Sequence, residues 1–511
     1  MRFQSMHNLN RVESESTDDD SGISCVDGQR KRRIISASVY VVACAFFASL
    51  NHVLVGYDVG VMSGAIIFIQ EDLKITEVQV EVLVGCLSIV SLVGSLVGGR
   101  TSDAVGRRWT MVLAASVFQV GAVIMTTAPS FELLLAGRIL AGIGIGFGSV
   151  VAPIYIAEIS PTVGRGCLTS FPEIFINLGI LLGYVSNYIF SGLPSDISWR
   201  IMLAVGTFPS ILVALALFII PESPRWLIMQ NRVDEARTVL LQTTDSEEEA
   251  DERMEEIQLA VVPADTEKFE QRSVWCELIC PSCAVGRMLL VGVGIQCFQQ
   301  ITGTDATVYY SPEIFREAGI QDNSSLLGAT VAIGATKTLF VFVAILLIDK
   351  LGRKPLLYVS TIGMTICTFG LGTSLRYHVQ WSSPWFSPAV IFACLNIAFF
   401  SVGMGPVCGV LTSEIYPQRL RAQAAALGVV GNRMCSGLVS MCFLSVSRAI
   451  STGGTFLVFS AISAISVVFV HIVVPETKGK SLEQIELLFR HEHQWKVSTA
   501  QNGNGDNLLP K

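Results

Sequence analysis

Six ionisable residues lie inside long apolar stretches, where a charge is costly and usually serves a function. They are three acids and three bases whose formal charges cancel: Asp58, Arg138, Glu173, Asp305, Lys337 and Arg433. The balance predicts paired charges around a water-accessible cavity. No nucleophile–base or metal-ligand constellation accompanies them, so we expect a protein that is not an enzyme and that needs no metal or cofactor.

Asp58 and Arg138 could bind and release a proton together. Asp58 comes late in the first apolar stretch, between Gly56 and Gly60, and Arg138 is one or two turns into the fourth. A carboxylate that loses its cationic partner or its water takes up a proton more readily. The alternative is an acid close to a loop and an arginine whose head reaches the membrane interface.

Lys337 is the deepest charge. It stands eleven residues from each end of its apolar stretch, 326–348, too far to reach an interface comfortably. It therefore needs an anionic partner, and Asp305 and Glu173 are available. Because charge-assisted hydrogen bonds are stronger than neutral ones, these three residues suit a ligand rich in hydrogen-bonding groups. The alternative is a salt bridge that only fastens helices, and both roles can coexist.

Uncharged polar side chains favour the same kind of ligand. Gln299 and Gln300 begin one motif, and Asp305 and Tyr309 follow four residues apart, on one face of a helix. Amides and phenols suit a polyhydroxylated ligand because they both donate and accept hydrogen bonds. Core packing is the alternative for Tyr309 and Tyr310.

The elements that position these residues are expected to be membrane helices. Of 511 residues, 51% are hydrophobic and 15% are charged, and the mean hydropathy is +0.55, whereas a soluble domain has about 25% charged residues. This composition excludes a disordered chain, a disulfide scaffold and an ordinary cytosolic enzyme, and nucleic acid is not an expected partner. Apolar stretches of about 20 residues or more are predicted at 36–69, 80–99, 109–128, 132–156, 168–190, 200–220, 286–313, 326–348, 355–375, 389–413, 423–447 and 454–473.

Lys and Arg concentrate in alternate loops, which places both termini and the central loop in the cytoplasm. The sequon at Asn323 then falls outside, where glycosylation is allowed. The predicted fold is an all-α membrane protein with twelve transmembrane helices in two six-helix halves. Its predicted divisions are an N-terminal tail (1–35), a first half (36–220), a central loop (221–285), a second half (286–473) and a C-terminal tail (474–511).

Three motifs recur about 250 residues apart. They are Asp-x-x-Gly-Arg-Arg at 103–108 and Asp-x-x-Gly-Arg-Lys at 349–354, Glu-Ile-Ser-Pro at 158–161 and Glu-Ile-Tyr-Pro at 414–417, and Pro-Glu-Ser at 221–223 and Pro-Glu-Thr at 475–477. A shared offset near half the chain predicts two parallel halves with a ligand between them.

The repeated motifs carry both signs of charge and predict a cytoplasmic latch between the halves, which holds the inner face closed. Its predicted members are Asp103, Arg107, Arg108, Glu158, Arg165, Glu222 and Arg225 in the first half, and Asp349, Arg353, Glu414, Arg421 and Glu476 in the second. The alternative is ordinary positive-inside anchoring with incidental acids.

Together these motifs resemble the sugar porter branch of the major facilitator superfamily. The matching strings include Arg-Ile-Leu-Ala-Gly-Ile-Gly-Ile-Gly at 138–146, Pro-Glu-Ser-Pro-Arg-Trp-Leu at 221–227, Gln-Gln-Ile-Thr-Gly at 299–303, Gly-Met-Gly-Pro at 403–406 and Pro-Glu-Thr-Lys-Gly at 475–479. Gly-Tyr-Asp-Val-Gly-Val-Met-Ser-Gly-Ala at 56–65 and Phe-Pro-Glu at 171–173 are most similar to plant polyol and monosaccharide transporters. The resemblance implies proton symport of linear polyols and sugars across the plasma membrane by a protein expected to be monomeric.

The resemblance also implies residue roles. An Asp–Arg pair at the positions of Asp58 and Arg138 couples proton to substrate in similar symporters. Sugar porters typically have neutral amides where this chain has Glu173, Asp305 and Lys337.

Three further positions bear on the predicted ligand site. Asn432 matches a sugar-contacting Asn of the family. Arg433 replaces a Trp that often follows it, and Gly409 stands where the tenth span usually has a Trp.

Two other functions remain open, an uncoupled facilitator and a non-transporting sensor that signals through its cytoplasmic segments. Cys276, Cys280 and Cys283 together with His52 are compatible with a sensor or a metal site, but we favour loop thiols and helix packing as their interpretation. The other cysteines mostly lie in apolar runs and are expected to be small buried hydrophobes.

Overall fold

A computed structural model describes residues 20–160, 168–244, 246–260, 276–377, 387–417 and 420–478, together with residues 485 and 489. The first half contains α1 (Asp20–Leu73), α2 (Glu77–Val105), α3 (Arg107–Thr127), α4 (Phe131–Ile159), α6 (Phe171–Phe190), α7 (Ser195–Val205) and α8 (Thr207–Leu217). The connecting segment contains α9 (Pro224–Met229), α10 (Val233–Thr243) and α11 (Glu247–Ala260). The second half contains α13 (Cys283–Ile301), α14 (Thr304–Tyr309), α15 (Ser311–Glu317), α16 (Asn323–Leu351), α17 (Arg353–Arg376), α18 (Pro388–Val402), α19 (Met404–Ile415), α20 (Arg421–Ile450) and α21 (Thr452–Ile472).

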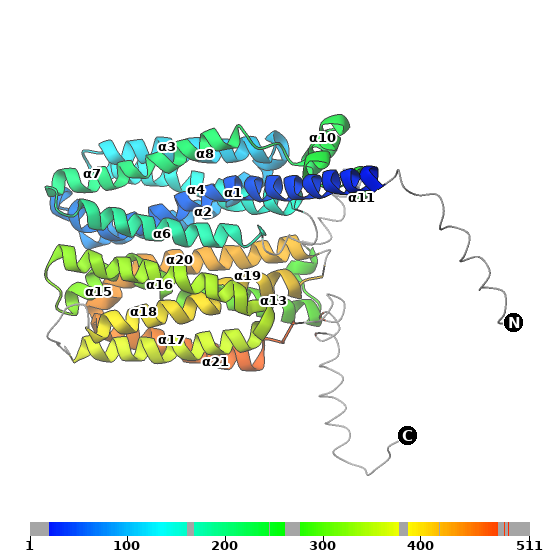
Figure 1. Cartoon of the computed structure of the whole chain (residues 1–511). Helices are drawn as coiled ribbons and strands as arrows, with labels where there is room; N and C mark the ends of the chain where they lie inside the picture. The colour runs from blue at the N-terminus through cyan, green and yellow to red at the C-terminus, as the bar shows by residue number, and fades with distance from the viewer. Residues whose placement is uncertain are drawn as a thin grey trace, which may run out of the picture.

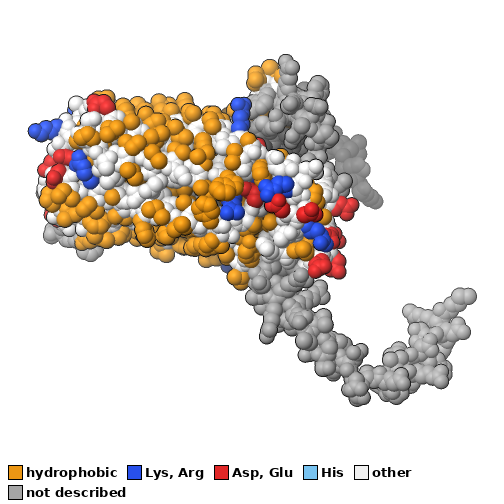
Figure 2. All heavy atoms as spheres, turned by 90° about the horizontal axis from the view of Figure 1, so that it is seen from above, with side chains coloured by type: hydrophobic (Ala, Val, Ile, Leu, Met, Phe, Trp, Pro, Cys, Tyr) orange, Lys and Arg blue, Asp and Glu red, His pale blue; other side chains and the backbone are white. Residues whose placement is uncertain are grey.

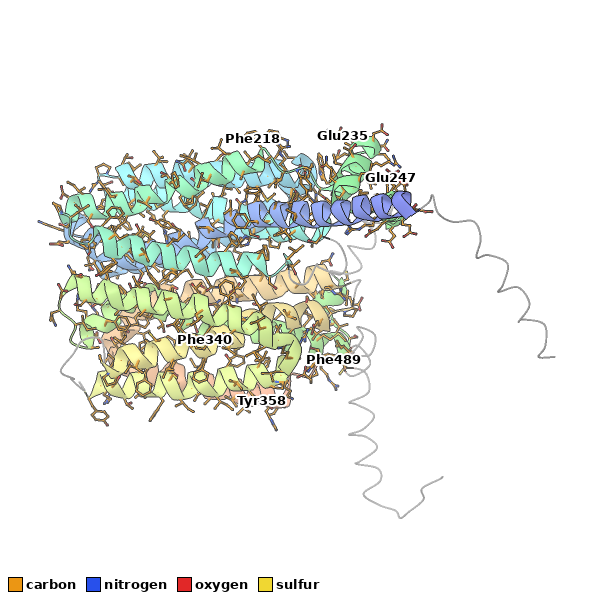
Figure 3. All side chains as sticks on the ribbon, viewed as in Figure 1. Phe218, Glu235, Glu247, Phe340, Tyr358 and Phe489 are labelled. Atoms are coloured by element: carbon orange, nitrogen blue, oxygen red, sulfur yellow. The ribbon has the colours of Figure 1, made fainter. Side chains whose placement is uncertain are left out.

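The described residues contain 12 helical segments long and apolar enough to cross a membrane, as predicted. Figure 1 shows the helices running lengthwise in two stacked bundles, with α10 at one end and α15 at the other. We name these the α10 end and the α15 end. Figure 2 shows apolar side chains over the flank and charged side chains gathered toward the ends, the pattern that a bilayer requires. In Figure 3, Phe218 and Tyr358 lie on opposite flanks, whereas Glu235 and Glu247 lie at the α10 end.

Helix α1 packs closely on α6 because glycines line their contact. A Cβ on Gly56 would lie 1.9 Å from the carbonyl oxygen of Ile176, and one on Gly60 would lie 2.4 Å from that of Ile180. Small residues let membrane helices approach in this way. The contact holds Asp58, between the two glycines, in the interior of the first half.

The span predicted at 286–313 is interrupted. Helix α13 ends at Ile301, Gly303 adopts a φ of +85°, and α14 begins at Thr304. Glycine enters this left-handed region without steric cost. The break places Asp305 in the first turn of α14, where a carboxylate is stabilised by the positive end of the helix dipole.

The halves meet mainly where α2 packs on α20 and α6 on α16. A Cβ on Gly85 of α2 would lie 2.3 Å from Cγ of Met441 on α20, but one on Gly99, nearer the α10 end, would meet nothing within 4 Å. The seam between α2 and α20 is therefore tight toward the α15 end, whereas Gly99 borders open space.

Candidate functional site

A central cavity of about 210 Å³ lies between the two halves. Every predicted substrate contact except Tyr310 lines it, namely Glu173, Gln299, Gln300, Asp305, Tyr309, Lys337, Asn432 and Arg433. Tyr310 instead lines a separate cavity of about 360 Å³ that also contains residues of α15. The Tyr310 hydroxyl donates to the Ser440 carbonyl at 2.7 Å, and its ring stacks on Phe443 at 4.9 Å. Tyr310 therefore occupies a packing position in this conformation.

The amides of the second half form one cluster. Asn432 Nδ2 donates to Gln299 Oε1 at 2.7 Å and to Gln296 Oε1 at 3.0 Å, and Gln300 Nε2 donates to Asn432 Oδ1 at 3.2 Å. Gln300 Oε1 is buried and has no hydrogen-bond partner in the described part of the chain. Since a buried acceptor without a partner is costly, the cluster suits a ligand that brings hydroxyl donors. Sequence reasoning missed Gln296, although its position one turn before Gln300 could have indicated it.

The charged residues of the cavity do not pair directly. Among the described residues, neither Asp305 nor Glu173 forms an ion pair with Lys337. Asp305 accepts a hydrogen bond from Ser436 Oγ at 2.5 Å. Lys337, only 9% exposed, lies 5.9 Å from the Phe400 ring centroid. The cavity therefore holds separated charges that remain available to a ligand, rather than a closed salt bridge.

The Asp58–Arg138 pair forms as the sequence predicts and lies behind the cavity wall. Arg138 Nη1 is 2.7 Å from both carboxylate oxygens of Asp58, and Arg138 Nε donates to the Leu83 carbonyl at 3.1 Å. Arg138 is 0% exposed and Asp58 is 2% exposed. Val55 and Val59, on the same helix as Asp58, line the cavity. A ligand in the cavity would thus be one layer of side chains away from the buried pair.

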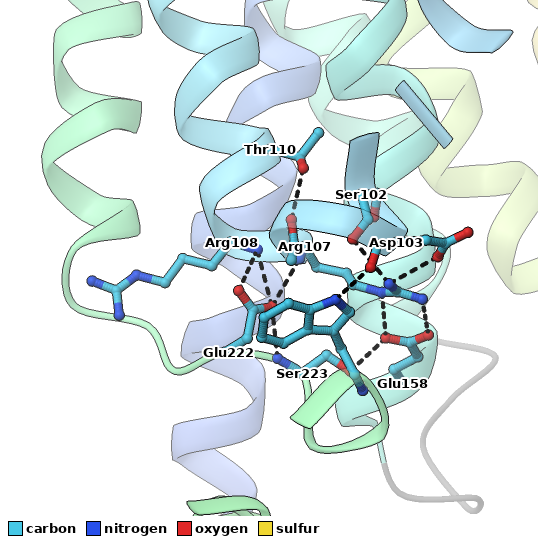
Figure 4. A network of polar contacts seen from close by, with 10 residues as sticks. Ser102, Asp103, Arg107, Arg108, Thr110, Glu158, Glu222 and Ser223 are labelled. Atoms are coloured by element: carbon cyan, nitrogen blue, oxygen red, sulfur yellow. Dashed lines mark hydrogen bonds and ion pairs between the residues drawn. The ribbon is translucent and has the colours of Figure 1, made fainter. Parts of the chain in front are cut away.

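At the α10 end, Glu158 and Glu222 organise a network of the first half, which we call the Glu222 cluster (Figure 4). Glu222 accepts from the backbone N–H groups of Arg107 at 2.9 Å and Arg108 at 3.1 Å, capping the N-terminus of α3. Arg107 binds Glu158 through Nε and Nη2, both at 3.1 Å, and reaches Asp103 at 3.0 Å. These contacts join segments of one half to each other.

The second half repeats the arrangement in a Glu476 cluster. Glu476 accepts from the backbone N–H groups of Arg353 at 3.1 Å and Lys354 at 3.0 Å, and Arg353 Nη2 donates to Glu414 at 2.7 Å. Gly106 and Gly352, which precede the arginines, have φ values of +106° and +100°. The repeated motifs therefore build the same cap twice.

The pKa values of the two capping acids are shifted in opposite directions. Burial raises the pKa of Glu222 despite its backbone donors. Burial would also raise the pKa of Glu476, but hydrogen bonds from the backbone N–H groups of Lys478, Arg353 and Lys354 outweigh it and lower that pKa. Acidification therefore neutralises Glu222 before Glu476.

The remaining predicted latch residues contribute little to these clusters. Arg165 and the side chain of Asp349 lie outside the described residues. Arg225 is exposed, and Arg421 donates to the Tyr416 carbonyl at 3.3 Å. The ion pairs of both clusters that the structure describes stay within one half, whereas the predicted latch would join the halves.

Sequence reasoning also missed a contact between the halves near the α15 end. Glu81 on α2 is 3% exposed and accepts from the Ser445 backbone N–H at 2.7 Å and from Ser445 Oγ at 2.6 Å. One turn earlier on α2, Glu77 pairs with Arg448 of α20. The available signal for Glu81 was an acid at the start of the second apolar stretch, 80–99.

Gly409, where sugar porters usually have a Trp, leaves open space, because a Cβ there would meet no heavy atom within 4 Å. Gly405, one turn earlier on α19, lines the cavity. We therefore expect Gly409→Trp to fold and to place a ring beside the ligand. Burial of about 20–60 Å² of the ring against the ligand would contribute about 0.5–1.5 kcal/mol and lower the KM for uptake about two- to tenfold.

Initial-rate uptake across substrate concentrations measures this change. Gly192→Trp is the matched control, because its Cβ would also meet nothing within 4 Å and it does not line the cavity. Equal KM values for both variants and the parent would show that position 409 does not contact the ligand.

The described residues form twelve candidate spans in two halves around a polar cavity, which defines an integral membrane transporter. Comparison of the chain with known proteins identifies its family. A family model described as "Sugar (and other) transporter" matches residues 44–489. The chain therefore belongs to this family of the major facilitator superfamily, as its motifs indicate, and is a multi-pass membrane transporter rather than an enzyme.

Individual relatives are similar in sequence to this chain over nearly its whole length. "Probable polyol transporter 4" of Arabidopsis thaliana is 66% identical over 472 residues, covering 92% of this chain and 89% of the relative. "Polyol transporter 5" of the same plant is 45% identical over 487 residues, covering 92% and 90%. A solved structure described as the proton:xylose symporter XylE bound to 6-bromo-6-deoxy-D-glucose has a TM-score of 0.73 at 28% identity, covering 88% of this chain and 99% of that chain.

Proposed function

We propose that this protein is a proton-coupled symporter of linear polyols and monosaccharides that works by alternating access. The observation that carries the proposal is the buried Asp58–Arg138 pair directly behind a cavity lined with amides and separated charges. Substrate in the cavity can alter the pairing of Asp58 and hence its proton affinity. The similarity to the polyol transporters and to the proton:xylose symporter supports both parts of the proposal.

The test is transport by the purified chain in proteoliposomes with an imposed pH gradient. Labelled sorbitol, mannitol, myo-inositol and glucose should accumulate uphill, and each transported substrate should evoke an inward proton flux. A protonophore should reduce accumulation to equilibration. Uptake that only equilibrates in the presence of the gradient would establish the facilitator instead, and binding without uptake would establish the sensor.

We also propose that both termini and the α10 end face the cytoplasm, that the protein is a monomer and that the membrane is the plasma membrane. The concentration of Lys and Arg in the loops of the α10 end supports the orientation. In this orientation the described contacts between α2 and α20 close the extracellular side. The Glu222 and Glu476 clusters would re-pair across the halves when the cytoplasmic side closes, as the latch hypothesis requires.

Glu81→Gln is expected to favour opening at the α15 end. The change weakens two hydrogen bonds to a buried carboxylate, and bonds to charged groups contribute about 1.5–3 kcal/mol each. Loss of one such bond shifts the conformational equilibrium about tenfold or more. Spin labels on the α1–α2 and α20–α21 connections should then report a larger population of long distances.

Asp322→Asn is the control for this measurement. Asp322 caps α16 at the same end by accepting from Ser325 N–H at 2.9 Å, within one half. Indistinguishable distance distributions for Glu81→Gln and Asp322→Asn would rule out a gating role for Glu81.

A further inference from the structure

Three thiols cluster where the central segment enters the second half. Cys276, Cys280 and Cys283 are all exposed, and Cys280 N–H donates to the Cys276 carbonyl at 2.9 Å, which closes one helical turn. Cys283 is the first residue of the membrane span Cys283–Tyr309. The transport mechanism uses none of these thiols.

The packing around the cluster turns the thiols outward. Leu278 is 6% exposed and belongs to the apolar core that contains Val285 and Met288 of α13. Its neighbour Ile279 is 76% exposed. Leu278 therefore anchors the turn to the second half, and Ile279 leaves an apolar surface beside the thiols.

The structure argues against two other uses of these cysteines. Within the described residues, no group of three or more His, Cys, Asp or Glu side chains is arranged to hold a metal ion. All three are free thiols rather than disulfides. Of the other cysteines whose side chains the structure describes, only Cys442 is exposed, so among these side chains three exposed thiols occur together only in this segment.

We propose that Cys276, Cys280 and Cys283 form a site of S-acylation by long-chain fatty acids. Juxtamembrane cysteines take this modification. The proposal rests on the orientation proposed above, because long-chain acyl-coenzyme A is supplied from the cytoplasm, but it does not depend on transport.

The reaction is a thioester exchange catalysed by a membrane acyltransferase. The cysteine sulfur attacks the acyl carbonyl carbon of the acyl-coenzyme A, a new carbon–sulfur bond forms, and the bond to the coenzyme A sulfur breaks. The proton of the cysteine thiol ends on the coenzyme A thiol, and no atom is oxidised or reduced.

An acyl chain attached at the start of the span would enter the adjacent hydrocarbon. Membrane affinity rises with each CH₂ group of the chain that enters the hydrocarbon. The twelve spans already anchor the protein, so acylation would instead hold the segment before α13 against the bilayer. Helix α13 carries Gln299 and Gln300 of the cavity.

The experiment uses the full chain expressed in plant-cell membranes. Free thiols are blocked with N-ethylmaleimide, thioesters are cleaved with hydroxylamine, and the released thiols are tagged with a polyethylene glycol maleimide that shifts the band. We expect one to three hydroxylamine-dependent shifts for the parent and for Cys442→Ser, and none for the triple variant Cys276→Ser/Cys280→Ser/Cys283→Ser. No shift in the parent, or unchanged shifts in the triple variant, would overturn the proposal.

A second measurement separates this proposal from those on which it rests. A membrane-impermeant maleimide should label the three thiols, after hydroxylamine treatment, only in permeabilised cells. Labelling in intact cells would overturn the orientation and the acylation together. Substrate uptake by the triple variant tests transport separately, because these thiols do not line the cavity.

Discussion

Asp58→Asn is expected to abolish uphill, pH-dependent uptake and to reduce accumulation to equilibration. The asparagine keeps the size of the side chain and its ability to accept a hydrogen bond from Arg138, but it cannot cycle a proton. The substrate-induced proton current should disappear, whereas exchange of substrate across the membrane can persist.

The single variant also carries a stability cost that must be separated from coupling. Arg138 is 0% exposed, so removal of the Asp58 charge leaves a buried cation without its partner. Such a loss costs about 3–5 kcal/mol. Asp58→Asn/Arg138→Gln removes both charges and should recover much of the unfolding temperature while still lacking the proton current.

Proton current and unfolding temperature, measured on the same membranes, decide the role of the pair. If the double variant regains stability and exchange but not current, the Asp58 carboxyl is the coupling group. A substrate-induced current of parental size in either variant, normalised to surface amount, would rule out Asp58 as the coupling group.

Lys337→Asn is expected to lower expression and stability, and the triple variant Glu173→Gln/Asp305→Asn/Lys337→Asn to recover them. Removing only the lysine leaves two carboxylates in a largely buried cavity. The loss should approach, without exceeding, the roughly 3–5 kcal/mol of a broken buried pair, since Lys337 has no direct ion pair in the part of the chain that the structure describes. The triple variant removes all three charges, so none of them is left without a counter-charge.

The triple variant should also change the preferred ligand from linear polyols to ring-form hexoses. A linear polyol loses more rotational freedom on binding than a ring, so it depends more on strong hydrogen bonds. Charge-assisted bonds from the carboxylates and the ammonium group supply these, and amides supply weaker ones.

Uptake competition among sorbitol, mannitol, myo-inositol and glucose, corrected for surface amount, measures the preference. Glu313→Gln controls for removal of a carboxylate, because Glu313 lines the separate cavity near the α15 end. If the triple variant ranks the ligands as the parent does, the three charges serve structure rather than recognition.

The sequence by itself determined the twelve candidate spans, the two related halves and the charged and amide side chains that line the cavity. Apolar runs and charge in hydrocarbon are local properties, since each depends only on neighbours along the chain and on the cost of placing a polar group in lipid. The Asp58–Arg138 pair was predictable for the same reason, because a buried charge without a partner is too costly to persist.

Only the tertiary structure decided which partners meet. Lys337 lies near two acids and pairs directly with neither, Arg107 pairs within its own half, and Glu81 reaches Ser445 across the halves. The need for glycine at the break, position 303, also became visible only in the fold, because a Cβ there would lie 2.4 Å from Cδ2 of Phe459. Distances between side chains on different helices depend on helix tilt, rotation and the glycines that set helix spacing. Hydropathy along one chain does not encode those quantities, and a transporter must also change them as it works.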